Sequence, residues 1–433
     1  MVNPRLSEIT LSRVDLEDSR DGSIRQNGRN NSAPSKEAPT PQSKEAALRT
    51  LSAVRELGPK IRAAADEIEQ ARRLPLHIVR EMQRAGVFRM PMPRAWGGPE
   101  LDLASQMRVI EMLSMADASA GWCAMIGTDG GYVTAFIDQA VAREMYPDID
   151  SVTAITFAPP GKAVKTKGGF TVNGRWPFAS GCQHATWLIG HFAIFDGDSP
   201  RLQPNGLPET RFGFLPAEEC EILDTWTTNG LRGSGSHDWT VTDRFIPEER
   251  TFNLAAPTLY RKGPLYALPN LLLYKFSAVG LGIARGAIED FMALALKKPV
   301  TFKSPSGGKA ILRDETYAQC AVAQTEALVS SARSFVFDTV NDMWKTLLTG
   351  DLPSLKQRAR ARLAMVHAST ACTQAVELLY KANGGSSVYT GNAFDRRLRD
   401  IQTVNQHTVV SLKTWEVMGR VLLGLDPNYG LLF

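Results

Sequence analysis

The stretch Trp226-Thr-Thr-Asn-Gly-Leu-Arg-Gly-Ser-Gly-Ser236 carries the most specific pattern in this chain of 433 residues. Gly233 and Gly235 let the backbone approach a ligand closely, because they have no side chain. The hydroxyls of Ser234 and Ser236 can donate and accept hydrogen bonds beside it. The stretch lies in a region of short β-branched runs that is flanked on both sides by helical periodicity. A β domain between two helical regions is therefore expected.

The rest of the chain divides around that β region. Residues 1–44 are rich in Asn, Ser, Pro and charge, which predicts a disordered tail. Residues 45–150 show apolar positions at three- and four-residue spacing and form the first helical domain. Residues 151–255 form the β domain of about seven strands, and residues 256–433 form a helical bundle. The absence of βαβ alternation argues against a Rossmann domain.

Local signals predict where individual elements begin and end. Asn173-Gly174 is expected to form a tight turn after a strand that starts at Gly169. Ser304-Pro-Ser-Gly-Gly308 separates the first two helices of the bundle. Four long helices are expected in the bundle, near 268–297, 311–347, 353–382 and 398–424.

Composition excludes several classes of function. The net charge is +4, from 49 basic and 45 acidic residues, so the sequence does not indicate a nucleic-acid-binding protein. The five cysteines form no CxxC pair, which gives no zinc signature and fits reduced thiols in a cytoplasmic enzyme. No signal peptide is evident, and no apolar run reaches the roughly 18 residues that a membrane span needs.

A nicotinamide cofactor is also not expected. Gly280-Leu-Gly282-Ile-Ala-Arg-Gly286 misses the G-x-G-x-x-G spacing by one residue and lies within an apolar helical stretch. We interpret these glycines as sites of close helix packing. The sequence contains no P-loop either.

Four short stretches, in order, resemble the acyl-CoA dehydrogenase superfamily over roughly residues 45–425. They are Pro93-Arg-Ala-Trp-Gly-Gly98, Gly169-Phe-Thr-Val-Asn-Gly-Arg-Trp176, Gly230-Leu-Arg-Gly-Ser234, and Gly384-Gly385 followed by Arg399-Asp400. The resemblance implies an α+β fold that is mostly α, with an N-terminal helical domain, a middle β-barrel or sandwich, and a C-terminal four-helix bundle. It also implies a flavin bound between the β domain and the helices, and a homotetramer.

The catalytic base of the dehydrogenases is missing from both places where that family has it. The run Arg399-Asp-Ile-Gln-Thr-Val-Asn-Gln-His407 contains no Glu, and a histidine lies near the expected position. Between Arg250 and Ile288, where a minority of the family has its Glu, the sequence has no acidic residue.

Three segments instead resemble the two-component flavin-dependent monooxygenases of this fold, a group that includes p-hydroxyphenylacetate hydroxylase and dibenzothiophene monooxygenase. These segments are Trp176-Pro-Phe-Ala-Ser-Gly-Cys182, Trp226–Ser236, and the R-D-x(6)-H run that ends at His407. The resemblance implies reduced flavin, FMNH2 or FADH2, supplied by a separate reductase. It further implies a C4a-hydroperoxyflavin that oxygenates an aromatic or heteroaromatic small molecule.

The resemblance assigns site residues. His407 is the expected base and Ser180 the expected hydrogen-bond donor to the flavin. The other expected flavin-binding residues are Trp176, Phe178, Arg232, Gly233, Ser234, Gly384 and Gly385. The expected substrate-contacting residues are Trp122, His184, His237 and Trp226, and no metal ligand is expected.

Structural roles compete with these assignments. Trp176, Phe178 and Trp226 also suit a β core, Arg232 a structural ion pair, and His184 and His237 ordinary satisfied histidines. Two other functions remain open, namely an FAD-containing acyl-CoA dehydrogenase-like oxidoreductase and a non-catalytic protein with a flavin fold. The substrate, the oxygenated atom and the choice between FMN and FAD are not determined by the sequence.

Overall fold

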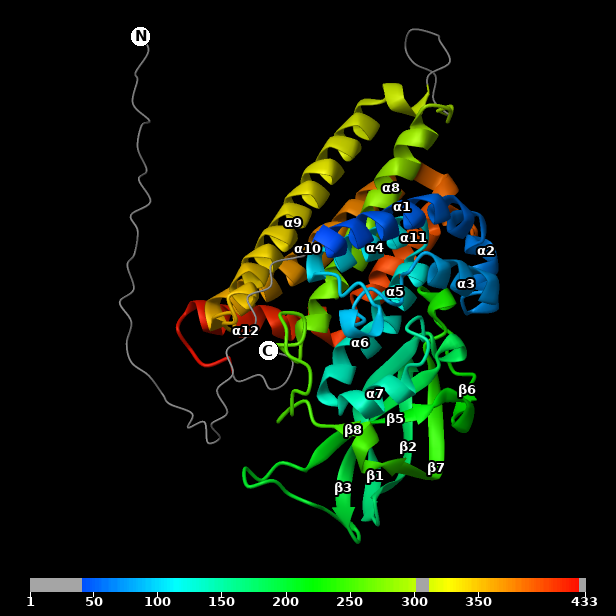
Figure 1. Cartoon of the computed structure of the whole chain (residues 1–433). Helices are drawn as coiled ribbons and strands as arrows, with labels where there is room; N and C mark the ends of the chain where they lie inside the picture. The colour runs from blue at the N-terminus through cyan, green and yellow to red at the C-terminus, as the bar shows by residue number, and fades with distance from the viewer. Residues whose placement is uncertain (1–40, 301–310, 428–433) are drawn as a thin grey trace, which may run out of the picture. The chain divides into compact units, whose positions relative to one another are not determined.

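The computed structural model describes residues 41–300 and 311–427, and it has a block of helices, a β-sheet and a second block of helices (Figure 1). The first block holds α1 (Pro41–Ala63), α2 (Ala65–Ala71), α3 (Leu76–Arg84), α4 (Leu103–Ala116), α5 (Ala118–Gly127), α6 (Asp129–Val133) and α7 (Gln139–Met145). The last block holds α8 (Phe276–Ala295), α9 (Thr316–Leu348), α10 (Leu355–Asn383), α11 (Ala393–Val404) and α12 (Leu412–Leu422). The predicted fold class is confirmed.

The middle block is one mixed sheet of eight strands, ordered β6-β7-β2-β1-β3-β5-β8, with β4 beside β3. The strands are β1 (Thr153–Thr166), β2 (Gly169–Ala179), β3 (Trp187–Asp196), β4 (Ser199–Pro200), β5 (Thr210–Pro216), β6 (Glu221–Leu223), β7 (His237–Pro247) and β8 (Thr251–Phe252). β1 pairs antiparallel with β2 and parallel with β3. The Ser180 and Ser236 segments therefore lie side by side, because β2 pairs with β7 up to Ala179 and His237.

The predicted turn at Asn173-Gly174 is wrong, because β2 runs through both residues and its register against β7 shifts there instead. The turn lies at Lys167-Gly168, where Gly168 has a φ of +81°. Gly174 serves packing, since a Cβ there would lie 2.5 Å from the ring of Trp176. The small residue makes room for a buried indole in the middle of the sheet.

Small residues also let the helices of the bundle pack closely. A Cβ at Gly282 in α8 would lie 2.2 Å from the main-chain oxygen of Glu111 in α4, and one at Gly286 would lie 2.4 Å from Arg397. The interpretation of this glycine run as a packing surface is confirmed. The stretch Leu271–Ala295 is apolar enough to span a membrane, but 94% of its most apolar window is buried in the protein, as in the core helix of a globular fold.

The predicted helix over residues 398–424 is wrong, because the chain leaves the helix between Val404 and Leu412. Asn405 ends α11, and the side chain of His407 accepts a hydrogen bond from the main-chain N–H of Val409, which starts a short 3-10 turn. His407 therefore lies on a connection between two helices, where its ring is not committed to a helix face.

Two other predictions concern residues whose structure is not described. The break at Ser304–Gly308 lies outside the described residues, and so do positions 1–40 of the predicted tail. The last four positions of that tail, 41–44, belong to α1. All the described residues belong to one compact unit.

Candidate active site

Three serines from two segments form a hydrogen-bonded row beside a tryptophan. The Oγ atoms of Ser180 and Ser236 are 2.7 Å apart, and those of Ser236 and Ser234 are also 2.7 Å apart. The indole Nε1–H of Trp122 donates to Ser180 Oγ over 2.8 Å. All four side chains are buried. The structure thus joins two of the predicted segments at Ser180.

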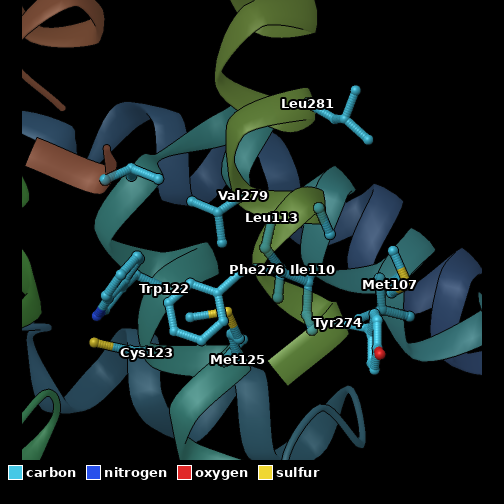
Figure 2. Close-up of a cluster of buried hydrophobic side chains, with 14 of the residues drawn as sticks. Met107, Ile110, Leu113, Trp122, Cys123, Met125, Tyr274, Phe276, Val279 and Leu281 are labelled. Carbon is cyan, nitrogen blue, oxygen red and sulfur yellow. The ribbon is translucent and has the colours of Figure 1, made fainter. Parts of the chain in front are cut away.

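Trp122 is held firmly where it meets Ser180. Its helix, α5, is capped by Asp117, which accepts a hydrogen bond from the main-chain N–H of Ala120 over 2.9 Å. α5 also packs tightly on α4, because a Cβ at Gly121 would lie 1.8 Å from Ser114 Oγ. The indole then lies beside Phe276 within a buried apolar cluster drawn from α4, α5 and α8 (Figure 2).

His407, on the connection between α11 and α12, contacts the same apolar cluster. Its ring centroid lies 4.3 Å from that of Phe276 and 5.9 Å from that of Trp122. Trp122 therefore contacts both predicted catalytic residues, Ser180 through its N–H and His407 through its ring. This convergence brings together positions that are 227 residues apart in the sequence.

The surroundings of His407 keep its ring neutral. Burial, together with the nearby positive charge of Arg362, lowers the pKa of the imidazole to about 4. Nδ1 accepts the Val409 N–H over 3.3 Å, so the proton of the neutral ring lies on Nε2. Within the described part of the chain, Nε2 has no hydrogen-bond partner. His407 therefore presents an N–H donor.

Two aromatic side chains at this edge of the β domain reach solvent. Phe178 is 68% exposed and has a φ of +64°, which is a strained conformation for a residue with a Cβ. Its ring packs edge-on against Trp226, with centroids 6.2 Å apart. Trp226 is half-buried, and its Nε1–H donates to the main-chain oxygen of Leu231 over 2.9 Å. Together they form an aromatic surface that a planar ligand can contact.

Trp176 lies elsewhere, in the core of the β domain. It is fully buried, stacks on Trp239 at 4.2 Å and donates its Nε1–H to the main-chain oxygen of His191. Those contacts leave it no surface for a ligand, so its contact with flavin is not carried into the proposal below.

The glycine-rich segment is shaped by its neighbours in the fold. A Cβ at Gly233 would lie 2.0 Å from Ile68 Cγ2, so this glycine lets α2 pack on the segment. Leu231 and Gly235 have φ values of +48° and +52°, which make the tight turn around the 3-10 helix Arg232–Ser234. The guanidinium of Arg232 donates to the main-chain oxygens of Glu69 and Thr228 over 3.5 Å and 3.4 Å.

The two histidines near these segments differ in their hydrogen bonds. His237 is 2% exposed, and its Nδ1 accepts the main-chain N–H groups of Thr225 and Trp226, both over 3.2 Å. This bonding gives His237 a structural role in holding the loop of Trp226. In His184 both ring nitrogens are buried without a hydrogen-bond partner among the described residues. Burial lowers the pKa of His184 to about 4.

Gly384 and Gly385 lie on the exposed 3-10 turn Gly384–Val388 that follows α10. No atom lies within 4 Å of a Cβ built at either position, so packing within the chain does not require these glycines. Lys298 holds this turn in place, because its Nζ donates to Asn383 Oδ1 over 2.7 Å and to Ser386 Oγ over 2.6 Å.

Two contacts that support the site are not evident from the sequence. The buried Lys275 Nζ lies 2.8 Å from Asp129 Oδ1 and fixes the chain just before Phe276. A lysine inside an apolar run was the available signal, because such a charge needs a buried partner. Phe276 itself gave no signal, since an aromatic residue in an apolar helix usually fills the core.

These residues fit the predicted flavin. The exposed Phe178 and the half-buried Trp226 match a planar ring, and Ser180 supplies a hydroxyl. Gln183 Oε1 and the two ring nitrogens of His184 are buried without a hydrogen-bond partner among the described residues. They lie in the same two segments as the serines, since a Cβ at Gly235 would be 2.8 Å from Gln183 Oε1 and one at Gly181 would be 3.1 Å from His184 Nε2. A ligand that carries hydrogen-bonding groups along one edge suits such a set. Burial also raises the pKa of the Cys182 thiol to about 12, so it is not a nucleophile here.

Known proteins resemble this chain over most of its length. The family model of the acyl-CoA dehydrogenase N-terminal domain matches residues 45–149, and that of the C-terminal domain matches residues 274–412. The indole-3-acetate monooxygenase of Acinetobacter baumannii is 32% identical over 378 residues, which cover 86% of this chain and 93% of that protein. The oxygenase subunit HsaA of a flavin-dependent monooxygenase from Rhodococcus jostii is 30% identical over 361 residues, covering 81% and 91%.

Solved structures give the same picture. The crystal structure of a 3-HSA hydroxylase from Rhodococcus sp. RHA1 superposes with a TM-score of 0.80 at 26% identity. The superposed region covers 89% of this chain and 99% of the hydroxylase chain.

Proposed function

Since the chain belongs to the acyl-CoA dehydrogenase family and is a flavin-dependent monooxygenase of that family, we propose that it transfers one oxygen atom to an aromatic or heteroaromatic small molecule. The observation that carries this proposal is the meeting of Ser180 and His407 at Trp122. A hydroxyl, a neutral imidazole and an apolar wall lie together there. The alternative, an acyl-CoA dehydrogenase, needs a carboxylate base that neither expected segment contains.

A bound reduced flavin would activate molecular oxygen and provide the oxygen atom that is transferred. Phe178 and Trp226 would hold its ring, with Ser180 at the polar edge. The exposed turn at Gly384 and Gly385 supports a second contact with the cofactor, because neither glycine is needed for packing within the chain. Trp122 and Phe276 exclude water from the reacting atoms.

In this proposal, His407 contacts the substrate and not the flavin. Its Nε2–H donates to a substrate oxygen, which stabilises a phenolate or an equivalent anion. To take a proton at Nε2, the ring would have to change tautomer and give up the bond from Val409. The relatives named for indole-3-acetate and p-hydroxyphenylacetate support an electron-rich ring as the substrate class.

A separate reductase is the proposed source of reduced flavin. The oxygenase subunit and oxygenase component named among the relatives support it. The glycine-rich run nearest to a dinucleotide-binding pattern, Gly280–Gly286, packs helices instead. A homotetramer and a cytoplasmic location complete the proposal. The exposed apolar side chains of α12 support assembly, and the absence of disulfides among the described cysteines suits a reducing compartment.

The test uses the full chain and reduced flavin. Protein is mixed without oxygen with chemically reduced FMN or FAD, oxygen is added, and the absorbance is followed with a panel of phenols and indoles. We expect a transient absorbance before oxidised flavin appears, and hydroxylated product with at least one compound. The exposed Ser52 gives a control, because Ser52→Ala should match wild type while Ser180→Ala releases more hydrogen peroxide. Reoxidation at the rate of free flavin with every compound would overturn the proposal.

A further inference from the structure

The direction in which the Ser180 hydroxyl points follows from its two partners. We infer that Trp122 and Ser236 are positioning residues that turn the Ser180 O–H toward an acceptor on the bound flavin, an inference that rests on the proposed function. Trp122 then acts through its N–H, and is more than a wall of the substrate site. Three hydrogen bonds, and the number of protons available to them, determine this direction.

Trp122 determines one hydrogen bond of the Ser180 hydroxyl. An indole N–H only donates, so the contact of 2.8 Å makes Ser180 Oγ an acceptor toward Trp122. A serine hydroxyl has one proton and two lone pairs. The single proton of Ser180 can therefore go either to Ser236 or out of the row toward a ligand.

The row of serines allows three proton orders, because Ser236 can donate to only one of its two neighbours. In two of these orders Ser180 donates to Ser236, and the proton of either Ser234 or Ser236 then needs another acceptor. No further partner contacts either hydroxyl among the residues that the structure describes, and the two side chains are 1% and 3% exposed. A buried donor without a partner costs about 1–3 kcal/mol.

In the remaining order, every hydroxyl proton has an acceptor once a ligand is bound. Ser234 donates to Ser236, and Ser236 donates to Ser180. Ser180 then accepts two hydrogen bonds, from Ser236 and Trp122, and its own proton points to the ligand. A ligand acceptor selects this order, and each bond in such a chain strengthens the next.

The placement is rigid enough for this role. α5 is capped by Asp117 and packs against α4 at Gly121, which fixes the indole. Gly235 makes the turn that brings Ser236 back to Ser234, with a φ of +52°. A donor that is held in advance loses little entropy when the ligand binds.

The first test needs no ligand. Protein labelled with 15N-tryptophan is compared with Trp122→Phe, which identifies one of the eight indole N–H signals as that of Trp122. In Ser180→Ala we expect this signal to shift and its hydrogen exchange to accelerate at least tenfold. Trp344→Phe is the matched control, because Trp344 Nε1 is buried without a hydrogen-bond partner among the described residues. An unmoved signal in Ser180→Ala would overturn the inference.

The second test measures, in the absence of oxygen, the affinity for reduced FMN and reduced FAD, whose ring carries carbonyl acceptors. Trp122→Phe and Ser236→Ala should each weaken binding about twofold to tenfold, the effect of one neutral hydrogen bond. Neither should weaken it further in a Ser180→Ala background, while Trp344→Phe should have no effect. Equal losses in both backgrounds would overturn the positioning role and leave the proposed function intact. A wild-type protein that binds neither flavin would overturn the proposed function, and the inference with it.

Discussion

The Asp400 side chain accepts a hydrogen bond from the main-chain N–H of Leu231 over 2.7 Å, although 169 residues separate them in the sequence. Next to this bond, a Cβ at Gly230 would lie 2.1 Å from the main-chain oxygen of Arg399. The Arg-Asp pair of α11 thus seats the glycine-rich segment of the β domain against the bundle. These two parts of the sequence pattern form one contact, which holds the row of serines beside Trp122.

Asp400→Asn should change how stability depends on pH. Burial raises the pKa of Asp400 from 3.8 to about 7, and the negative charge of Asp117 adds to the rise. The folded protein therefore holds a proton that the unfolded chain releases. Stability from this group is complete below about pH 4 and is lost as the pH rises through 7. The asparagine keeps an acceptor for Leu231 and has no charge to bury.

The measurement is the midpoint of unfolding of both proteins between pH 4.5 and 8. We expect Asp400→Asn to match wild type at the acidic end and to exceed it at pH 8. At about 1.36 kcal/mol per pKa unit, the gain is at most about 4 kcal/mol. A difference that stays constant over this range would show that Asp400 is ionised in the folded protein.

Two substitutions of His407 separate a donor from a base. Glutamine can place an N–H near the position of Nε2 but takes no proton, whereas glutamate takes a proton but lacks a donor when ionised. Because Nδ1 is bonded to Val409, we expect His407→Gln to keep product formation within about tenfold of wild type. His407→Glu and His407→Ala should fall by more than that. The ratio of product to hydrogen peroxide measures the effect, and activity in His407→Glu alone would favour a base.

The glycines of the two predicted cofactor segments should respond differently to alanine. Gly233→Ala places a Cβ 2.0 Å from Ile68 Cγ2, so overpacking should cost about 1–3 kcal/mol of folding free energy. Gly385→Ala has open space around it and an ordinary backbone conformation, so it should unfold like wild type. If Gly385 contacts the cofactor, Gly385→Ala should weaken flavin binding and leave the free energy of unfolding unchanged. Denaturant unfolding and flavin titration check both variants, and a destabilised Gly385→Ala would contradict this account.

Assembly should depend on α12. Leu412 and Leu423 are 85% and 79% exposed at its two ends, an apolar surface that a homotetramer would cover. The double variant Leu412→Glu/Leu423→Glu should lower the mass measured by light scattering from that of a tetramer to that of smaller species. Leu48→Glu, at a leucine of α1 that is 68% exposed, is the control and should leave the mass unchanged. A tetramer that persists in the double variant would exclude α12 as the interface.

The fold could be predicted from the sequence because its signals are local. Three- and four-residue periodicity marks the helical regions, and β-branched runs mark the sheet between them. The glycines of α8 were interpreted correctly, since their apolar surroundings already favoured close packing. The turn at Asn173-Gly174 and the unbroken helix over 398–424 were wrong. Pairing with β1 and β7 carries β2 through Asn173 and Gly174. In the second case a local contact decides, because the side chain of His407 caps the short turn that interrupts the helix.

The sequence by itself determined the class of protein, and it predicted Ser180 and His407 as the residues that carry its chemistry. Only the tertiary structure decided that both contact Trp122, that Trp176 belongs to the core, and that His407 presents its Nε2–H. Spacing along a chain indicates which chemical groups are available. Which partner each group contacts depends on segments far apart in the sequence, 58 residues for the bond between Trp122 and Ser180 and 285 for the ring contact between Trp122 and His407. These segments meet only when the β domain packs together with both helical blocks.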